Sequence, residues 1–247
     1  MSRYRLLALD LDGTLLNGES EISPGNAEWV RRAREAGIVV ILSTGRGADS
    51  ASEFARQLEL DTPMITLNGG EIWRGPNELF RRTPLEASQI KELHRLARRS
   101  GDVWYWAYST EGLCNKEKWP EDIESREWLK FGFYSEELDQ IRAILEEIRT
   151  WDGLELSNSS PYNIEINPAG VSKAAAMEEV CRLVGCRMSE AVAMGDSLND
   201  IAAIRASGLG IAMGNAQEEV KQAADAVTSS HLEDGVARAI RDFVLKA

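Results

Sequence analysis

The sequence predicts an α/β protein in which a parallel sheet is interrupted by an inserted α+β module. Apolar runs such as Ile38–Leu42 are continuous rather than alternating, which is typical of strands covered on both faces. Helical stretches separate these runs, and strands joined through helices pair in parallel by right-handed crossovers. From about residue 80 to 167 the strands become aromatic and alternating, which indicates an antiparallel sheet with one half-exposed face.

The segments on either side of the insertion carry the elements of the parallel sheet. Ser23-Pro24 is a typical helix start and Gly37 a typical helix end. The expected order is strand 6–9, helix 24–37, strand 38–42, helix 48–58 and strand 64–67, then helix 172–184, strand 191–194, helix 199–206, strand 209–213, helix 216–224 and a last helix from 234. The predicted domains are therefore a discontinuous core of residues 1–80 and 168–247 and an inserted domain of residues 81–167.

The inserted segment contains two amphipathic helices, at about 86–99 and 136–149, and a strand over residues 103–108. One face of this strand carries Trp104, Trp106 and Tyr108, and the other carries Val103, Tyr105 and Ala107. We expect the first face to pack against the helices, because aromatic residues at period two usually form a core, which leaves the second face to meet a substrate. The alternative is that the first face stacks on a sugar or another ring of the substrate.

Composition argues against several partner classes. The formal net charge of −12 disfavours nucleic acid and anionic membranes, which attract basic surfaces. The apolar run Leu6–Leu11 is too short to span a membrane and is interrupted by Asp10. Three cysteines in no disulfide or metal pattern suit a reducing compartment, so we expect a cytoplasmic protein. The glycines at 208, 210 and 214 start and end a strand rather than open a helix, which argues against a dinucleotide-binding loop.

Asp10 and Asp12 close the first predicted strand, and Gly13-Thr14 turns the chain out of it. Alternation places both carboxylates on one side, at the strand end where open α/β sheets bind ligands. Two carboxylates this close repel each other, so a hard cation such as Mg²⁺ is the expected third partner. One carboxylate can then attack phosphorus while the other transfers protons. An ordinary loop with surface acids fits the same residues.

Three further clusters follow predicted strands or begin a predicted helix. Thr44-Gly45 offers a hydroxyl group and an unobstructed backbone N–H to an anion, although Thr-Gly also forms ordinary turns. Lys173 lies in the first turn of a predicted helix, where the helix dipole repels a positive charge unless an anion lies nearby. A solvated surface lysine is the alternative interpretation. Asp196 suits a metal ligand or a helix N-cap, with Asn199 one turn further on. Together the four clusters supply what phosphoryl transfer needs.

These clusters resemble the four motifs of the haloacid dehalogenase superfamily in residues, order and spacing. The motifs are Asp-x-Asp-Gly-Thr at 10–14, Thr-Gly-Arg at 44–46, Lys173 and Gly-Asp-x-x-Asn-Asp at 195–200. Thr-Gly-Arg, Asn-Gly-Gly at 68–70 and the inserted module look like the Cof-type sugar-phosphatase branch, subfamily IIB, whose α+β cap is of the C2B type. The resemblance covers nearly the whole chain and implies a Rossmann-like, doubly wound core with such a cap.

The resemblance also implies a role for each matching residue around one Mg²⁺ ion. Asp10 would be the nucleophile and a metal ligand, and Asp12 the general acid and base, which also offers its main-chain carbonyl to the metal. Asp196 would be the remaining metal carboxylate. Phosphate oxygens would be held by Leu11 (through its backbone), Thr44, Gly45, Lys173 and Asn199, with Arg46, Asn68, Ser197 and Asp200 in supporting positions.

The predicted function is Mg²⁺-dependent hydrolysis of a small phosphorylated metabolite, such as a sugar phosphate, by a monomer or homodimer. Phosphotransfer or mutase chemistry through the same intermediate is an alternative. A non-catalytic phosphoacceptor is another, but Asp12 argues against it, since a proton shuttle is unnecessary where an acyl phosphate must last. Leu11 stands where P-type ATPases carry a lysine, and dehalogenases do not need the second acid, so hydrolysis is the preferred reaction.

Overall fold

The computed structural model describes residues 3–246, and the chain divides into two compact units. The core unit runs to Arg81 and resumes at Lys173, and the inserted unit is Arg82–Ser172. Each unit has a hydrophobic core of its own. Within the described range, no helix combines the length and the apolar character needed to cross a lipid bilayer.

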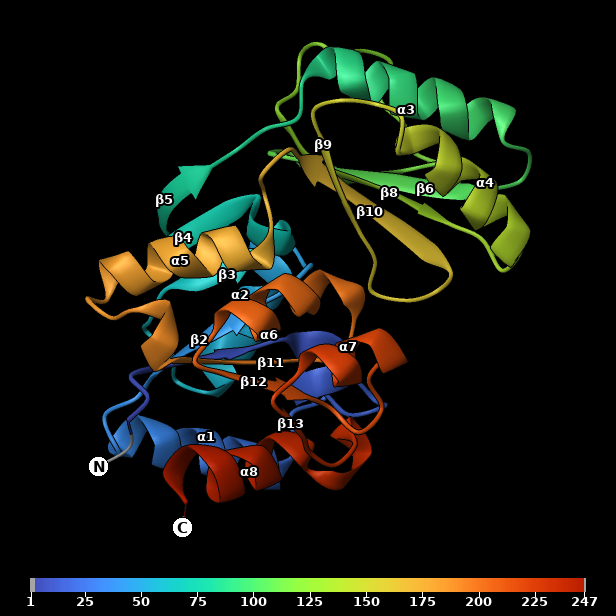
Figure 1. Ribbon diagram of the computed structural model, residues 1–247. Coiled ribbons are helices and arrows are strands. Elements are labelled where there is room, and N and C mark those ends of the chain that lie inside the picture. The colour runs from blue at the N-terminus through green and yellow to red at the C-terminus, as the bar shows by residue number, and fades with distance from the viewer. Residues whose placement is uncertain (1–2, 247) are drawn as a thin grey trace. The chain divides into compact units, whose positions relative to one another are not determined.

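The core unit is built on one eight-stranded sheet (Figure 1). Its strands are β1 (Leu6–Leu9), β2 (Val39–Ser43), β3 (Met64–Thr66), β4 (Glu71–Gly75), β5 (Glu78–Arg82), β11 (Ala191–Gly195), β12 (Leu209–Ala212) and β13 (Ala226–Val227). Their order is β13-β12-β11-β1-β2-β3-β4-β5. The six strands from β13 to β3 pair in parallel, and β4 adds to β3 in the antiparallel direction.

Helices cover both faces of this sheet. On one face α1 (Pro24–Glu35) packs against α8 (Gly235–Ala239), and on the other α5 (Lys173–Leu183) packs against α6 (Ile201–Ala206), as Figure 1 shows. The remaining core helices are α2 (Ala48–Gln57) and α7 (Glu218–Ala223). Because helices cover both faces, β1 and β11 are buried along their whole length. This confirms the interpretation of the continuous apolar runs.

The strand order reverses beside β1. From β1 the chain crosses to β2 on one side, whereas the later strand β11 pairs with β1 on the other side. In open α/β sheets, ligands bind at the carboxyl ends of the strands next to such a reversal. We therefore expect the ligand-binding residues to follow β1, β2 and β11 directly.

The inserted unit is a five-stranded antiparallel sheet with two helices on one face (Figure 1). Its elements are α3 (Ala87–Arg99), β6 (Trp104–Ser109), β7 (Gly112–Asn115), β8 (Trp128–Tyr134), α4 (Leu138–Ile148), β9 (Leu154–Ser157) and β10 (Asn163–Pro168). The strand order is β7-β6-β8-β10-β9. The predicted fold class, a parallel α/β core interrupted by an α+β unit, is confirmed.

The predicted orientation of the aromatic strand β6 is wrong. Val103, Tyr105 and Ala107 are the residues buried in the core that α3 and α4 form with the sheet. Trp106 lies on the opposite face, over the backbone of Gly132, where an added Cβ atom would meet the indole ring at 2.2 Å. Period two establishes which residues share a face. It does not establish which face the helices cover when both faces are apolar or aromatic.

The glycines that flank and interrupt β12 allow close backbone packing. A Cβ atom at Gly208 would lie 2.0 Å from the carbonyl oxygen of Ser189, and one at Gly210 would lie 2.4 Å from that of Ile204 in α6. Both contacts are with backbone atoms, which do not move aside as a flexible side chain does. Close packing therefore explains why glycine occupies these two positions.

We expect Gly210→Ala to lower the free energy of unfolding of the core unit by about 1–3 kcal/mol, because the methyl group overpacks against α6. Gly75→Ala is the matched control, since its added Cβ atom would lie 3.5 Å from the nearest atom, the carbonyl oxygen of Asp61. Urea titration followed by circular dichroism measures both variants. Equal unfolding midpoints would contradict the packing role of Gly210.

Candidate active site

Four neighbouring strands of the core sheet end at predicted motif residues. Asp10 follows β1, Thr44 follows β2, Asp196 follows β11, and Asn68 lies in the turn after β3. These strands are adjacent in the order β11-β1-β2-β3. Since parallel strands bring their carboxyl ends to one edge of a sheet, the fold gathers these residues from distant parts of the sequence.

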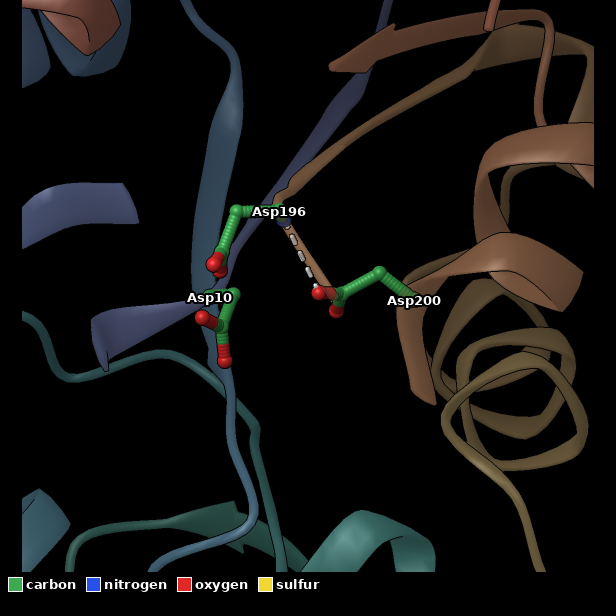
Figure 2. Close-up of side chains that lie close together, drawn as sticks. All are labelled: Asp10, Asp196 and Asp200. Atoms are coloured by element: carbon green, nitrogen blue, oxygen red, sulfur yellow. Dashed lines mark hydrogen bonds between the residues drawn. The ribbon is translucent and has the colours of Figure 1, made fainter. Parts of the chain in front are cut away.

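Three carboxylates form a cluster at this edge. Figure 2 shows Asp10, Asp196 and Asp200 turned toward one another, and one oxygen of each lies within 4.8 Å of the others. Asp200 Oδ2 accepts hydrogen bonds from the backbone N–H groups of Asp196 at 3.1 Å and Ser197 at 3.2 Å. Gly195 permits this approach, because a Cβ atom there would meet Asp200 Cγ at 2.2 Å.

Lys173 links two of these carboxylates. It is the first residue of α5, it is 1% exposed, and its Nζ donates to Asp10 Oδ1 and to Asp200 Oδ1, each at 2.7 Å. Burial by itself lowers the pKa of Lys173, but the two carboxylates more than offset this effect and raise the pKa above its usual value. The lysine is therefore a buried, charged member of the site and not a solvated surface residue.

The cluster carries more negative charge than Lys173 neutralises. Burial raises the pKa of Asp10 well above the usual aspartate value despite the nearby Lys173, and Asp200 and Asp196 raise it further. Burial and then Asp200 raise the pKa of Asp196 to about 7. Excess buried negative charge of this kind is relieved by protons or by a bound cation.

The donor atoms of the cluster fit a hard divalent cation such as Mg²⁺, which prefers carboxylate oxygens. Asp200 is held by the charged Lys173 and by two backbone N–H groups, whereas Asp196 accepts from two rotatable hydroxyl groups, those of Thr14 and Ser197. Asp10 and Asp196 are therefore the carboxylates best suited to bind the ion directly. These are the two side chains that the sequence predicted as ligands, whereas Asp12 was predicted to bind through its main-chain carbonyl.

The carboxylate of Asp12 has a different partner. Arg46 holds it in a two-bond ion pair, with Nε 2.7 Å from Oδ2 and Nη2 2.5 Å from Oδ1. The Asp12 side chain is 55% exposed, while the preceding Leu11 is buried and presents only its backbone to a ligand. Gly13, at a φ of +75°, completes the turn, and a Cβ atom there would lie 2.5 Å from Asp196 Oδ2.

The predicted phosphate-binding residues after β2 are joined to the turn after β3. Thr44 Oγ1 accepts from the backbone N–H of Arg46 at 3.1 Å, across Gly45, and the Thr44 carbonyl accepts from the N–H of Asn68 at 3.0 Å. Asn68 has a φ of +58°, and its Oδ1 accepts from Asn199 Nδ2 at 3.3 Å. Asn199 Oδ1 is buried and, within residues 3–246, has no hydrogen-bond partner. That atom is available to a ligand.

Two residues around the site were not predicted as site residues. Thr14 Oγ1 donates to Asp196 Oδ1 at 3.3 Å, and Ser197 Oγ, whose supporting position was predicted, donates to Asp196 Oδ2 at 3.1 Å. Asn215 Nδ2 donates to the carbonyl oxygen of Gly13 at 2.8 Å. The place of Thr14 in the first motif was a signal for its role. Nothing in the sequence around Asn215 connects it to Gly13.

Comparison with known proteins assigns the family. The model of the haloacid dehalogenase-like hydrolases matches residues 7–132 and 113–240. The chain belongs to this family. This match confirms the family resemblance that the motifs predicted, and it extends over most of the sequence.

Two curated relatives are phosphatases. The enzyme is 46% identical over 241 residues, 98% of this chain and 96% of the relative, to 5-amino-6-(5-phospho-D-ribitylamino)uracil phosphatase YcsE of Bacillus subtilis (strain 168). It is 29% identical over 274 residues, 98% of this chain and 99% of the relative, to pyridoxal phosphate phosphatase YbhA of Escherichia coli (strain K12).

A solved subclass IIB sugar phosphatase of the superfamily has the same fold, with a TM-score of 0.84 at 24% identity over 97% of this chain and 98% of that one. The family match and the relative at 46% identity identify the protein as a phosphatase of the Cof-type branch, and the solved structure shares its fold, a Rossmann-like core with an inserted cap.

The raised pKa of Asp196 predicts the pH dependence of stability without metal. Because the folded-state pKa, about 7, exceeds the ordinary value of 3.8, the folded state binds this proton more tightly. The contribution of Asp196 to stability therefore falls as pH rises from about 4 to about 7. Asp196→Asn removes this ionisation, so in EDTA the variant should melt at a higher temperature than wild type at pH 8, with a smaller difference at pH 5.

Differential scanning calorimetry at both pH values measures this, with and without MgCl₂. MgCl₂ should raise the melting temperature of the wild type at pH 8 but not that of Asp196→Asn. Asp152→Asn, an exposed aspartate of the inserted unit, is the control and should follow the wild type. A metal-free Asp196→Asn protein that melts below wild type at pH 8 would show that the buried charge is not unfavourable.

Proposed function

We propose that this phosphatase hydrolyses a small phosphorylated metabolite with Mg²⁺, through a phosphoaspartyl intermediate on Asp10. The observation that supports this most is the environment of the Asp10 carboxylate. One oxygen, Oδ1, is held by Lys173 Nζ at 2.7 Å, while the hydrogen bonds of the described residues leave Oδ2 without a donor. A buried carboxylate fixed at one oxygen and unengaged at the other is positioned to act as a nucleophile.

In the proposed reaction, Asp10 Oδ2 attacks phosphorus and the bond to the leaving oxygen breaks, while Asp12 donates a proton to that oxygen. Asp12 then takes a proton from a water molecule that attacks the phosphorus, which releases inorganic phosphate and restores Asp10. Lys173 stays paired with Asp10 and stabilises negative charge on the phosphoryl oxygens. Asp10 and Asp196 would hold a Mg²⁺ ion, which would supply positive charge that offsets the repulsion between the nucleophile and the phosphate.

Asp12 can act this way only after its ion pair with Arg46 opens. That pair is largely solvent-exposed, and exposed pairs contribute about 0–1 kcal/mol, so substrate binding can replace it at little cost. The proposed contacts to the phosphate oxygens are Thr44, Gly45, the backbone of Leu11, and Asn199 through the Nδ2 hydrogen that is not donated to Asn68. Asp200 supports them indirectly, because it anchors Lys173.

For the substrate, we propose 5-amino-6-(5-phospho-D-ribitylamino)uracil as the first compound to test. A relative named for this activity is 46% identical over 98% of the chain. A more distant relative is named for pyridoxal phosphate, so the choice of substrate varies among proteins of this fold. The cytoplasmic location and the monomeric or homodimeric state stay predictions.

We expect Asp10→Asn to lose at least about 1,000-fold in phosphatase activity, because a carboxamide cannot form the acyl phosphate. The assay is release of p-nitrophenol from p-nitrophenyl phosphate in the presence of MgCl₂. Asp152→Asn, which keeps the site intact, should retain wild-type activity. If Asp10→Asn were as active as wild type, the assignment of the nucleophile would be wrong.

Incubation with 5-amino-6-(5-phospho-D-ribitylamino)uracil, and with pyridoxal phosphate as the comparison compound, should release inorganic phosphate, with the first compound giving the higher kcat/KM. Sugar acceptors added to the same reaction separate hydrolysis from transfer. Phosphorylated acceptors in place of free phosphate would favour the phosphotransferase alternative. A phosphoaspartate that lasts for minutes without turnover would favour the phosphoacceptor alternative.

A further inference from the structure

The last turn of α5 brings two cysteines together. The N–H of Cys186 donates to the carbonyl of Cys181 at 2.9 Å, and the N–H of Gly185 donates to the carbonyl of Arg182 at 3.3 Å. Gly185 has a φ of +71°, the left-handed conformation that glycine adopts readily. These bonds form a Schellman motif, in which the side chains at the two ends commonly make a hydrophobic contact. Here both end positions are cysteines.

The two thiols interact with each other but differ in exposure. Cys181 is buried in the core and 2% exposed, whereas Cys186 is half-buried and reachable from solvent. Burial, and then the neighbouring Cys186 thiol, raise the pKa of Cys181. Met188 Sδ lies 3.6 Å from Cys181 Sγ, so a third sulfur atom lies beside the buried thiol.

We propose that Cys181 and Cys186 form an oxidation site, at which a peroxide converts the two thiols into a disulfide within one chain. The Schellman hydrogen bond places the Cys186 nitrogen 2.9 Å from the Cys181 carbonyl oxygen, so the two backbone positions are held close together, as a disulfide requires. The site is separate from the carboxylate cluster. Lys173 begins the same helix, and eight residues of helix, about 12 Å, separate it from Cys181.

The oxidation takes place in two steps, with hydrogen peroxide as the oxidant. The Cys186 thiolate, which is the more accessible, attacks one peroxide oxygen and becomes a sulfenic acid, and hydroxide leaves. The Cys181 thiol then attacks the Cys186 sulfur, and the hydroxyl group leaves with the Cys181 proton as water. The two thiols lose two electrons to the peroxide, and Cys186 is protected from further oxidation.

Peptide mapping tests the proposal, because Arg182 lies between the two cysteines. Native protein is treated with hydrogen peroxide, alkylated, and digested with trypsin without reduction. The reduced protein gives residues 174–182 and 183–187 as separate alkylated peptides. The oxidised protein should give one linked peptide that carries no alkyl group at either cysteine, with a mass lower than the sum of the two unalkylated peptides by two hydrogen atoms. The chain should migrate as a monomer on a non-reducing gel.

Matched variants make the result specific. Cys114, the third cysteine, is buried in the inserted unit, where Arg126 Nη1 contacts its sulfur at 3.3 Å, so Cys114→Ser should leave the linked peptide unchanged. Cys186→Ser should abolish it. The oxidised wild type should also melt roughly 2–6 °C higher than the reduced protein, and Cys186→Ser should show no such shift.

Three outcomes would overturn the proposal. Separate peptides with Cys186 as sulfinic or sulfonic acid would show that Cys181 does not reach the sulfenic acid. A link between two chains would show that the reaction is intermolecular. A linked peptide that forms only in urea would show that the native turn does not hold the two thiols in a reactive geometry.

Discussion

The ion pairs that bury Lys173 between Asp10 and Asp200 are the interaction on which the site depends. Removing one partner of a buried pair typically destabilises a protein by about 3–5 kcal/mol, because the other charge is left uncompensated. Lys173 cannot neutralise all three carboxylates, and this excess negative charge raises the pKa of Asp10 and of Asp196. The same imbalance that opposes folding without metal therefore creates an affinity for a cation.

The core sheet supplies the positions that this charge arrangement needs. Its parallel strands β11, β1 and β2 bring Asp196, Asp10 and Thr44 to one edge, where the strand order reverses. Gly13 and Gly195 then allow the first and last motifs to approach Asp196 and Asp200 without a Cβ atom in between. Glycine is therefore needed at these two positions because a carboxylate packs directly against the backbone there, and not only because the chain turns.

The parallel core, its helices and the strand-end positions of the motifs were predictable, because continuous apolar runs and helix signals are local in sequence. The partners of the charged residues were not. The sequence could not show that Lys173 bridges Asp10 and Asp200 or that Arg46 holds Asp12, since such contacts depend on three-dimensional distances. The wrong assignment for β6 has a similar cause. Alternation shows that Trp106 and Tyr105 lie on opposite faces of the strand, but it does not show which of these faces the helices cover.

Chemical trapping of the covalent intermediate tests whether Asp10 is the nucleophile. Enzyme turning over p-nitrophenyl phosphate with MgCl₂ is quenched into sodium borohydride, which reduces an aspartyl phosphate to homoserine. Trypsin then releases residues 6–31, which contain both Asp10 and Asp12 and can be sequenced by tandem mass spectrometry. The assignment of Asp10 as the nucleophile predicts homoserine at position 10 and unmodified aspartate at position 12. Homoserine at position 12, or continued turnover with no reduced residue, would contradict it.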